Sequence, residues 1–180
     1  MKLSRFAYPV ATAAVLCAVS TAMAAPASAA STVTFKNAGS GKNLEIDNKE
    51  LQKDGAKVQQ WDYKRSPAPK QGKWILKGLG NGKYSIVNAA NGKNLEIDNK
   101  DVNKDGAKVQ QWGYKGSNVP KNGQWIVKAL GKGAYSIVNA ANGKNLEIDN
   151  KDVAKNGAKA QQWGYKKGSN VPKVGQWVKG

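Results

Sequence analysis

Between Tyr84 and Lys115 the chain reads YSIVNAANGKNLEIDNKDVNKDGAKVQQWGYK, and the segment from Tyr135 to Lys166 repeats it with three differences in 32 positions. A more divergent copy starts at Val33, at an offset of 51 residues. Self-similarity at a fixed period is typical of a fold that repeats one structural unit along the chain. We therefore divide the chain into three repeats without linkers, at about 33–83, 84–134 and 135–180.

Each repeat has the pattern of four short strands separated by turns. The strands that we predict for the second repeat are 84–87, 94–98, 108–112 and 125–128. Asn91-Gly92 and Asp105-Gly106 are turn dipeptides. In 94–98 polar and apolar residues alternate with a period of two, which directs Leu95 and Ile97 to one side and the Glu96 carboxylate outward. Because no segment of twelve or more residues has a convincing helical pattern, the chain is predicted to be all-β.

The tryptophans fall into two sets of three. One set is flanked by branched apolar residues and is predicted to lie in the core: Trp74, Trp125 and Trp177. The other set stands among glutamines and before polar loops, and is predicted to be exposed: Trp61, Trp112 and Trp163. A repeat of this size cannot bury its own apolar face, so we expect the three repeats to share one core and to close on each other.

The composition excludes several kinds of chemistry. The 180 residues include 29 Lys and Arg, 12 Asp and Glu, one Cys and no His. Without imidazole there can be no Ser-His-Asp triad and no His-ligated metal. Asp101 to Gly106 matches the first half of a calcium loop, but Trp112 occupies the position of the bidentate glutamate, so a polar turn is favoured. We expect no metal and no cofactor.

The first 29 residues have the pattern of a secretory signal peptide. A positive start is followed by an apolar run at 10–19 and by small residues at 22–30. The apolar run is short for a membrane span. Cleavage after Ala29 leaves a single domain at 30–180 that has no cysteine, and lowers the formal charge from +17 to +15. We expect a secreted, extracellular monomer.

Three motifs of the second repeat resemble those of the ricin B-type lectin family, whose fold is the β-trefoil of three four-stranded repeats. They are GKNLEI at 92–97, GAKVQQW at 106–112 and NGQW at 122–125. The likeness recurs in all three copies and covers roughly 33–180. The resemblance implies a pseudo-three-fold β-trefoil with up to three carbohydrate sites.

The resemblance also implies which residues form each site. Family sites use an acidic residue of the second strand, an aromatic residue ending the third, and an Asn before the closing Gln-x-Trp motif. Carried over to this chain, these positions are Glu96, Trp112 and Asn122 in the second repeat, Glu45, Trp61 and Gln71 in the first, and Glu147 and Trp163 in the third. A second aromatic wall is expected from Tyr63, Tyr114 and Tyr165.

This chain departs from the family pattern in three respects. The usual aspartate is a glutamate in every copy. The Gln of Gln-x-Trp is replaced by Gly72, Gly123 and Gly175. The third repeat has Val174 where the site needs a hydrogen-bonding side chain, so we expect its site to be weaker or differently built.

Three classes of function follow. The first is a multivalent lectin, because a pyranose has an apolar C–H face that can stack on an aromatic ring and hydroxyls that suit a carboxylate and an amide. The resemblance implies galactose-type glycans or a deoxyhexose such as L-rhamnose as ligands, and several sites on one monomer make cell agglutination the expected activity. The second is a polyanion or nucleic-acid binder, favoured by the charge. The third, a glycosidase, is disfavoured because each repeat shows a lone site carboxylate, and we expect no catalytic residue.

Overall fold

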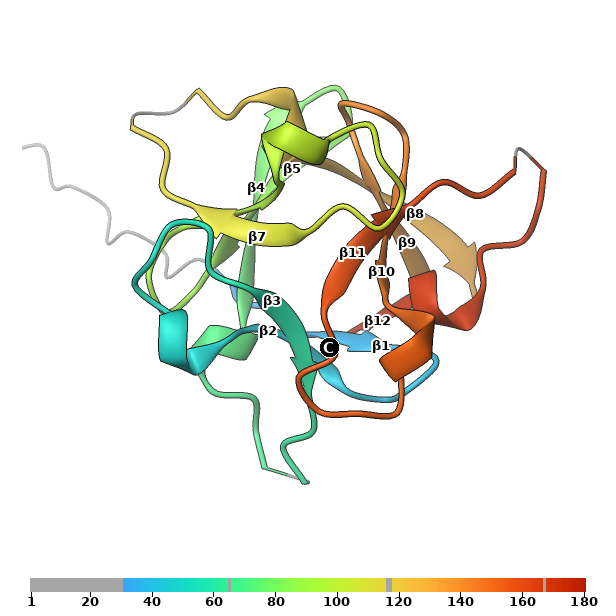
Figure 1. The fold of residues 1–180 in the computed structure, drawn as a ribbon, viewed down its shortest axis with the longest axis horizontal. Coiled ribbons are helices and arrows are strands. Elements are labelled where there is room, and N and C mark those ends of the chain that lie inside the picture. Colours follow the sequence, from blue (N-terminus) through green and yellow to red (C-terminus); the bar gives the residue numbers. More distant parts are fainter. Residues whose placement is uncertain (1–30, 65, 116–117, 167) are drawn as a thin grey trace, which may run out of the picture.

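The computed structural model describes residues 31–64, 66–115, 118–166 and 168–180, and this part of the chain contains strands and short 3₁₀ turns but no α-helix (Figure 1). The all-β prediction is confirmed. The predicted signal peptide at 1–29 lies outside the described residues. Within the described ranges, no helix is long and apolar enough to cross a membrane.

Each repeat contributes four strands, as predicted. In the first repeat these are β1 (Phe35–Asn37), β2 (Asn43–Ile46), β3 (Val58–Trp61) and β4 (Trp74–Gly80). In the second they are β5 (Lys83–Asn88), β6 (Asn94–Ile97), β7 (Val109–Trp112) and β8 (Gln124–Gly131). In the third they are β9 (Ala134–Asn139), β10 (Asn145–Ile148), β11 (Ala160–Trp163) and β12 (Trp177–Lys179).

Six 3₁₀ turns, which the alternation of the sequence did not reveal, link these strands in the described residues. After the second strand of each repeat come η1 (Asn48–Glu50), η3 (Asn99–Asp101) and η5 (Asn150–Asp152). Before the fourth strand come η2 (Lys70–Gly72), η4 (Lys121–Gly123) and η6 (Lys173–Gly175). An aspartate caps each turn of the first set: the Asp98 carboxylate accepts a hydrogen bond from the Lys100 amide at 3.0 Å. Short polar side chains stabilise such turns by satisfying free amides.

The fourth strand of each repeat pairs with the first strand of the next, and this pairing closes the structure. β4 pairs with β5, β8 with β9, and β12 with β1, where Phe35 faces Lys179. The second and third strands of each repeat form a hairpin, and β3, β7 and β11 lie around the centre of the view in Figure 1. The fourth strand β8 is longer than predicted because it continues into the hairpin with β9.

The core contains the three tryptophans predicted to lie there. Trp74, Trp125 and Trp177 have no exposed surface. Each indole N–H donates to a backbone carbonyl of the second strand of its own repeat, from Trp125 to Leu95 at 2.8 Å in the second repeat. A buried indole needs such an acceptor, so these rings both fill the core and fix the position of the second strand.

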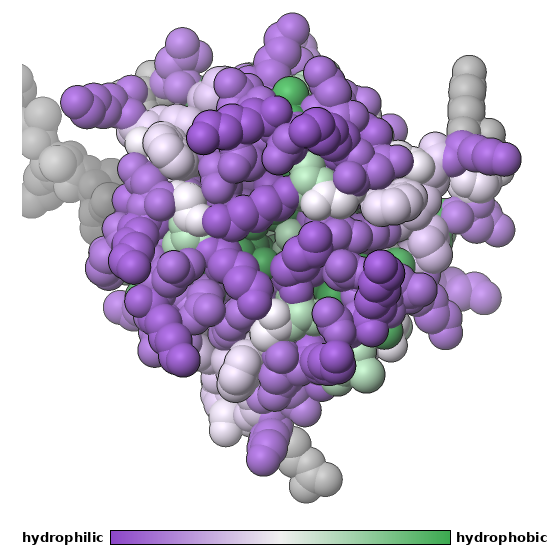
Figure 2. All heavy atoms as spheres, viewed as in Figure 1, coloured by the Kyte–Doolittle hydropathy of each residue, from purple (hydrophilic) through white to green (hydrophobic). Residues whose placement is uncertain are grey.

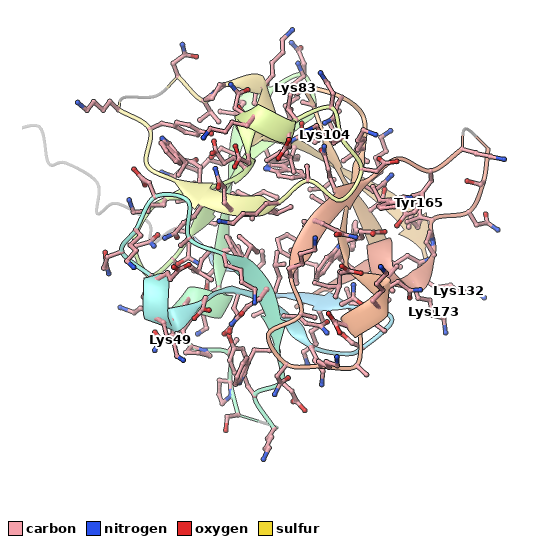
Figure 3. The ribbon with its side chains drawn as sticks, viewed as in Figure 1. Lys49, Lys83, Lys104, Lys132, Tyr165 and Lys173 are labelled. Atoms are coloured by element: carbon pink, nitrogen blue, oxygen red, sulfur yellow. The ribbon has the colours of Figure 1, made fainter. Side chains whose placement is uncertain are left out.

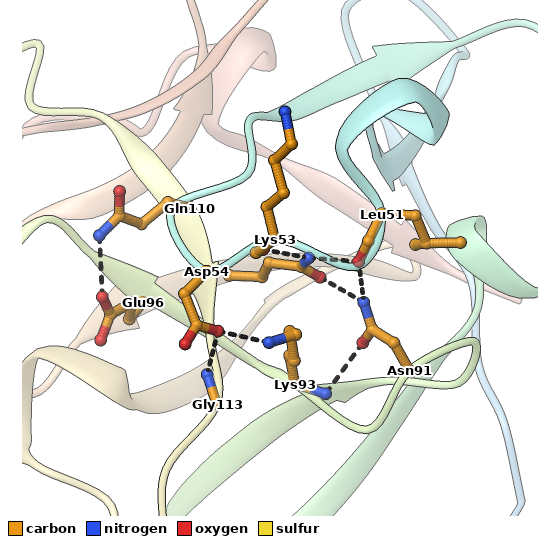
Figure 4. Close-up of polar contacts among 9 residues, drawn as sticks. Leu51, Lys53, Asp54, Asn91, Lys93, Glu96, Gln110 and Gly113 are labelled. Carbon is orange, nitrogen blue, oxygen red and sulfur yellow. Dashed lines mark hydrogen bonds and ion pairs between the residues drawn. The ribbon is translucent and has the colours of Figure 1, made fainter.

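Polar contacts fix each repeat to the next. Asp54 of the first repeat accepts hydrogen bonds from Lys93 Nζ at 2.5 Å and from the Gly113 amide at 2.8 Å (Figure 4). Asp105 makes the same contacts with Lys144 and Gly164, so this carboxylate of the calcium-like segment is already paired. At the closing interface the third repeat has Asn156, whose side-chain oxygen accepts from the Asp62 amide at 3.0 Å.

The surface is predominantly polar. Figure 2 shows hydrophilic residues over most of one face, with a small apolar area near its centre. The lysines labelled in Figure 3 lie on several sides of the molecule rather than on one. Among the large hydrophobic side chains that stay exposed are Trp61, Trp112 and Trp163, each 40% accessible. This distribution places three separate aromatic surfaces in a polar setting, one in each repeat.

Candidate functional site

One open pocket lies in each repeat, around the exposed tryptophan. The three pockets have volumes of about 420, 490 and 600 Å³ in the first, second and third repeats. Each is lined by the predicted glutamate, tryptophan and tyrosine and by one further predicted position, which is Gln71, Asn122 or Val174. The structure therefore brings together the residues that the sequence placed in each site.

The glutamates lie at the bottom of the pockets and are almost fully buried. Glu45, Glu96 and Glu147 are 3%, 4% and 5% exposed. The sequence predicted the outward direction of this carboxylate but not its burial. The glutamate does point away from the apolar core, but a glutamine of the third strand and a tyrosine beyond it cover the carboxylate.

At least two neutral side chains hold each carboxylate. In the second repeat, Gln110 Nε2 donates to Glu96 Oε1 at 2.9 Å (Figure 4), and the Tyr114 hydroxyl donates to Glu96 Oε2. The same bonds recur in the other repeats, from Gln59 and Tyr63 to Glu45 and from Gln161 and Tyr165 to Glu147. A buried charge needs such partners, because desolvation without them is costly.

Burial and the neighbouring carboxylate both raise the pKa of Tyr63, Tyr114 and Tyr165 far above the ordinary tyrosine value. These hydroxyls therefore stay protonated and act as hydrogen-bond donors. Burial also raises the pKa of Glu45, and the bonds from Tyr63 and Gln59 partly offset this rise. The first pocket thus combines a fixed phenol donor with a carboxylate that titrates above its ordinary range.

Replacing Tyr63 with Phe is expected to raise the pKa of Glu45 further, because the ring keeps the site buried while the donated hydrogen bond is lost. A raised pKa means that the folded state holds this proton more tightly than the unfolded chain does. The contribution of Glu45 to stability therefore falls as the pH rises from the unfolded pKa to the folded one. NMR titration of the Glu45 carboxyl carbon in both proteins measures the change, and an unchanged or lowered midpoint would contradict this account.

The exposed tryptophans are positioned by the neighbouring repeat. Trp112 ends β7, and a Cβ built on Gly55 of the first repeat would lie 4.0 Å from its ring atom Cζ3. A Cβ built on Gly106 would lie 3.9 Å from Cζ3 of Trp163, and one built on Gly157 would lie 4.0 Å from Cζ3 of Trp61. One edge of each ring is thus packed while 40% of the side chain stays exposed. A pre-positioned aromatic surface of this kind suits an apolar ligand face.

The position before the closing motif has a different role in each repeat. Asn122 Nδ2 donates to Glu96 Oε2 at 3.3 Å and to the Ile97 carbonyl at 2.8 Å, so both of its amide hydrogens are engaged within the protein. Gln71 and Val174 line their pockets. The backbone carbonyl of all three positions accepts from an asparagine of another repeat: Asn88, Asn139 and Asn37. The backbone contact thus recurs whatever the side chain is.

The glycines that replace the Gln of the closing motif are explained by the tyrosines. A Cβ on Gly123 would lie 2.7 Å from the Tyr114 hydroxyl, and the equivalent distances are 2.5 Å at Gly72 and 2.7 Å at Gly175. Such separations are too short for any side chain. The glycine, the tyrosine and the longer glutamate therefore form one arrangement, in which the tyrosine reaches the buried carboxylate only because the glycine leaves room.

We predict that Gly123→Ala displaces Tyr114 from Glu96 and weakens ligand binding in the second repeat by about tenfold, with a loss of about 1–3 kcal/mol of stability from the crowded contact. Binding in the first and third repeats should be unchanged. Titration of the variant followed by the indole N–H signals of Trp61, Trp112 and Trp163 separates the three pockets. Unaltered binding at Trp112 would show that Tyr114 has no role in the pocket.

The sequence did not identify several lining residues. Each pocket includes the glutamine of the third strand and an aspartate, asparagine and lysine that follow the glutamate, which are Asp98, Asn99 and Lys100 in the second repeat. The sequence feature that could have identified the last three is the Asp-Asn-Lys segment, which recurs two residues after the glutamate in all three repeats. The expectation of a lone carboxylate per repeat is therefore wrong. In the second repeat, the Asp98 carboxylate caps a 3₁₀ turn and the Glu96 carboxylate is held by a glutamine and a tyrosine. Both carboxylates of the pair therefore have structural roles.

The third pocket differs from the other two in its wall. Pro172, Lys173 and Val174 line it, whereas the second pocket has Pro120 and Asn122 in the corresponding wall. Tyr165 and Lys173 are labelled on the same side of the molecule in Figure 3. The buried Glu147 keeps its bonds from Gln161 and Tyr165 without help from position 174. In the described residues, no group of three or more His, Cys, Asp or Glu side chains is placed to hold a metal.

Comparisons with known proteins agree with this architecture. A family model described as a ricin-type beta-trefoil lectin domain-like family matches residues 23–112 and 70–163. The designed three-fold symmetric protein ThreeFoil has 32% sequence identity and a TM-score of 0.69, with 82% of this chain and 96% of that chain covered. Its likeness confirms the predicted β-trefoil. No curated protein sequence matches this chain.

Two natural proteins also share the fold. An exo-beta-1,3-galactanase from Clostridium thermocellum has 27% identity and a TM-score of 0.64, over 82% of this chain but only 29% of that one. The ricin B-like lectin of Macrolepiota procera, solved in complex with lactose, has 17% identity and a TM-score of 0.63, over 84% and 96% of the two chains. The fold thus occurs both in a lectin and as part of a glycosidase.

Proposed function

The chain belongs to the ricin-type β-trefoil lectin family, and we propose that it is a multivalent carbohydrate-binding protein without enzymatic activity. The observation that carries this proposal is the triplicated pocket, in which a tryptophan that is 40% exposed lies beside a buried, fully held glutamate. Catalysis by paired carboxylates needs one acid and one base or nucleophile with separate roles. Three near-copies of a binding pocket serve several ligands at once instead.

Each pocket is built to take one sugar ring. The tryptophan offers a stacking surface for the apolar C–H face, and amide, ammonium and carboxylate groups surround it for the hydroxyls. We propose galactose-type glycans or a deoxyhexose such as L-rhamnose as ligands. The lactose bound to the Macrolepiota procera lectin motivates the first choice. The third pocket, with Val174 in its wall, is proposed to bind more weakly or to prefer a different sugar.

Several pockets on one monomer allow cross-linking without oligomerisation. Exposed pockets of this size give weak single-site binding, in the millimolar to micromolar range by order of magnitude, and simultaneous binding at several sites raises the overall affinity by about 10²–10⁴. We propose that the protein agglutinates cells in this way. The segment 1–29 supports secretion, so the proposed working form is the extracellular domain at 30–180.

The alternative is a basic protein that binds nucleic acid or other polyanions, favoured by the formal charge of +15 that remains on the domain at 30–180. Against it, several lysines are paired with acids, and those labelled in Figure 3 do not form one face. A glycan array probed at about 50 and 200 mM salt separates the two functions. Neutral glycans should be bound equally at both, whereas signals confined to anionic probes that collapse at the higher salt would replace the lectin proposal.

A further inference from the structure

The first repeat contains a second hollow, and several of its lining residues directly follow Trp61 in the sequence. It has a volume of about 360 Å³, and its lining includes Thr34, Lys36, Asn43, Asp62, Lys64 and Lys73. Tyr63 lines both this hollow and the Trp61 pocket. Apart from this shared tyrosine, none of the residues predicted for the carbohydrate sites lines the hollow.

Three sequence differences shape this hollow in the first repeat. Lys36 stands where the other repeats have the buried Val87 and Val138, and Ala68 stands where they have the larger Val119 and Val171. Lys73 replaces Gln124 and Gln176, whose side chains donate to the carbonyls of Val119 and Val171 at 2.7 and 2.6 Å. The first repeat therefore loses a fixed contact and an apolar wall, and gains two ammonium groups.

The charge around the hollow is positive. Three lysines line it, at positions 36, 64 and 73, and Asp62 is the acidic residue among its lining. The ion pairs found in the described part of the chain involve other lysines. The Asp62 carboxylate already accepts a hydrogen bond from the Lys64 amide at 2.9 Å. Among the described residues these three ammonium groups have no carboxylate partner, and gathered around one hollow they attract an anion.

The wall of the hollow also contains an unsatisfied acceptor. Asn43 is 7% exposed, and its Oδ1 is buried without a hydrogen-bond partner in the described residues. Its counterpart Asn94 accepts from the Ser85 hydroxyl at 2.6 Å. Lys36 is the cross-strand partner of Asn43, so the two side chains start from adjacent strands at the same level. When the Asn43 side chain turns toward the hollow, a ligand hydroxyl can supply the missing donor, whereas a carboxylate alone cannot.

We propose that this hollow binds the acidic unit of an anionic saccharide, with its carboxylate or phosphate among the three lysines and a hydroxyl toward Asn43. That the ligand is a saccharide rests on the proposed function; that it is an anion rests on the lysines alone. Because Tyr63 is common to both cavities, one acidic oligosaccharide can place a neutral unit on Trp61 and its charged unit in the hollow.

The other repeats supply the variant that tests this proposal. Lys36→Val with Lys73→Gln copies the second and third repeats and should preserve folding, while Lys77→Gln with Lys128→Gln removes the same charge from exposed strand positions outside the hollow. Lys64→Gln, in an exposed loop, is a second variant with little risk to folding. Each protein is titrated with D-galacturonate, D-galactose 6-phosphate and D-galactose, and the amide signals of Thr34 and Lys73 and the indole signal of Trp61 are followed by NMR.

The acidic sugars are expected to shift the Thr34 and Lys73 signals in the wild type and in the Lys77/Lys128 control. The Lys36/Lys73 variant should bind these sugars with an affinity about tenfold lower than that of the wild type. Equal affinity in all proteins, or an equal loss in the control, would overturn the proposal, and so would tighter binding of single-stranded DNA through the same lysines. Comparison of the two acidic sugars shows which anionic group is preferred. If D-galactose leaves Trp61 unmoved while the acidic sugars bind, the lectin proposal fails at that pocket and the anion site stands.

Discussion

Alanine in place of both Trp61 and Trp112 is expected to abolish agglutination while the protein stays folded. Both rings are 40% exposed and line pockets, so their loss removes the stacking surface of two sites. The remaining pocket of the third repeat can hold one glycan but cannot bridge two cells. The expected fall in agglutination titre is about a hundredfold or more, since multivalent binding is lost and not merely weakened.

Thermal unfolding of the same double variant supplies the control. Each substitution should lower stability by only about 1 kcal/mol, as is usual for a half-exposed side chain outside the core. The single variants Trp61→Ala and Trp112→Ala should retain part of the activity, because two pockets remain in each. If the double variant unfolds, the rings are structural, and if it agglutinates like the wild type, the pockets are not the binding sites.

The opposite result is expected for Trp125→Ala. This ring is fully buried and donates to the Leu95 carbonyl, so its removal leaves a large cavity and an unpaired acceptor. The expected loss is about 3–5 kcal/mol, measured as the change in free energy of unfolding in urea. Trp112→Ala in the same repeat is the matched control. A loss below about 1 kcal/mol would show that the core does not depend on the buried set of tryptophans.

The fold could be predicted because the repeat made every local signal appear three times. The alternation in Asn94–Ile97 and the glycine turn at Gly92 before it specify a strand and its start. The length of β8 could not be predicted, because its last residues are strand only through pairing with β9. The 3₁₀ turns were missed because three residues leave no periodic pattern, whether an aspartate caps the turn, as at Asp98, or a proline precedes it, as at Pro120.

The membership of the candidate site was predictable in part, and its geometry was not. The likeness to the family placed Glu96, Trp112 and Asn122 in one site, and they do lie around one pocket. That the glutamate is covered depends on Tyr114 folding back over it, which in turn needs the space at Gly123. No property of these residues taken one at a time indicates that contact, since it arises from three segments that meet only in the folded chain.

The six tryptophans allow one measurement that tests the three-pocket account directly. Indole N–H signals are recorded by NMR during titration with D-galactose, lactose and L-rhamnose in turn, at moderate salt. A bound sugar is expected to shift the signals of the exposed set, Trp61, Trp112 and Trp163, and to leave the buried set, Trp74, Trp125 and Trp177, in place. No shift with any of the three sugars, or shifts that appear in the buried set instead, would contradict this account.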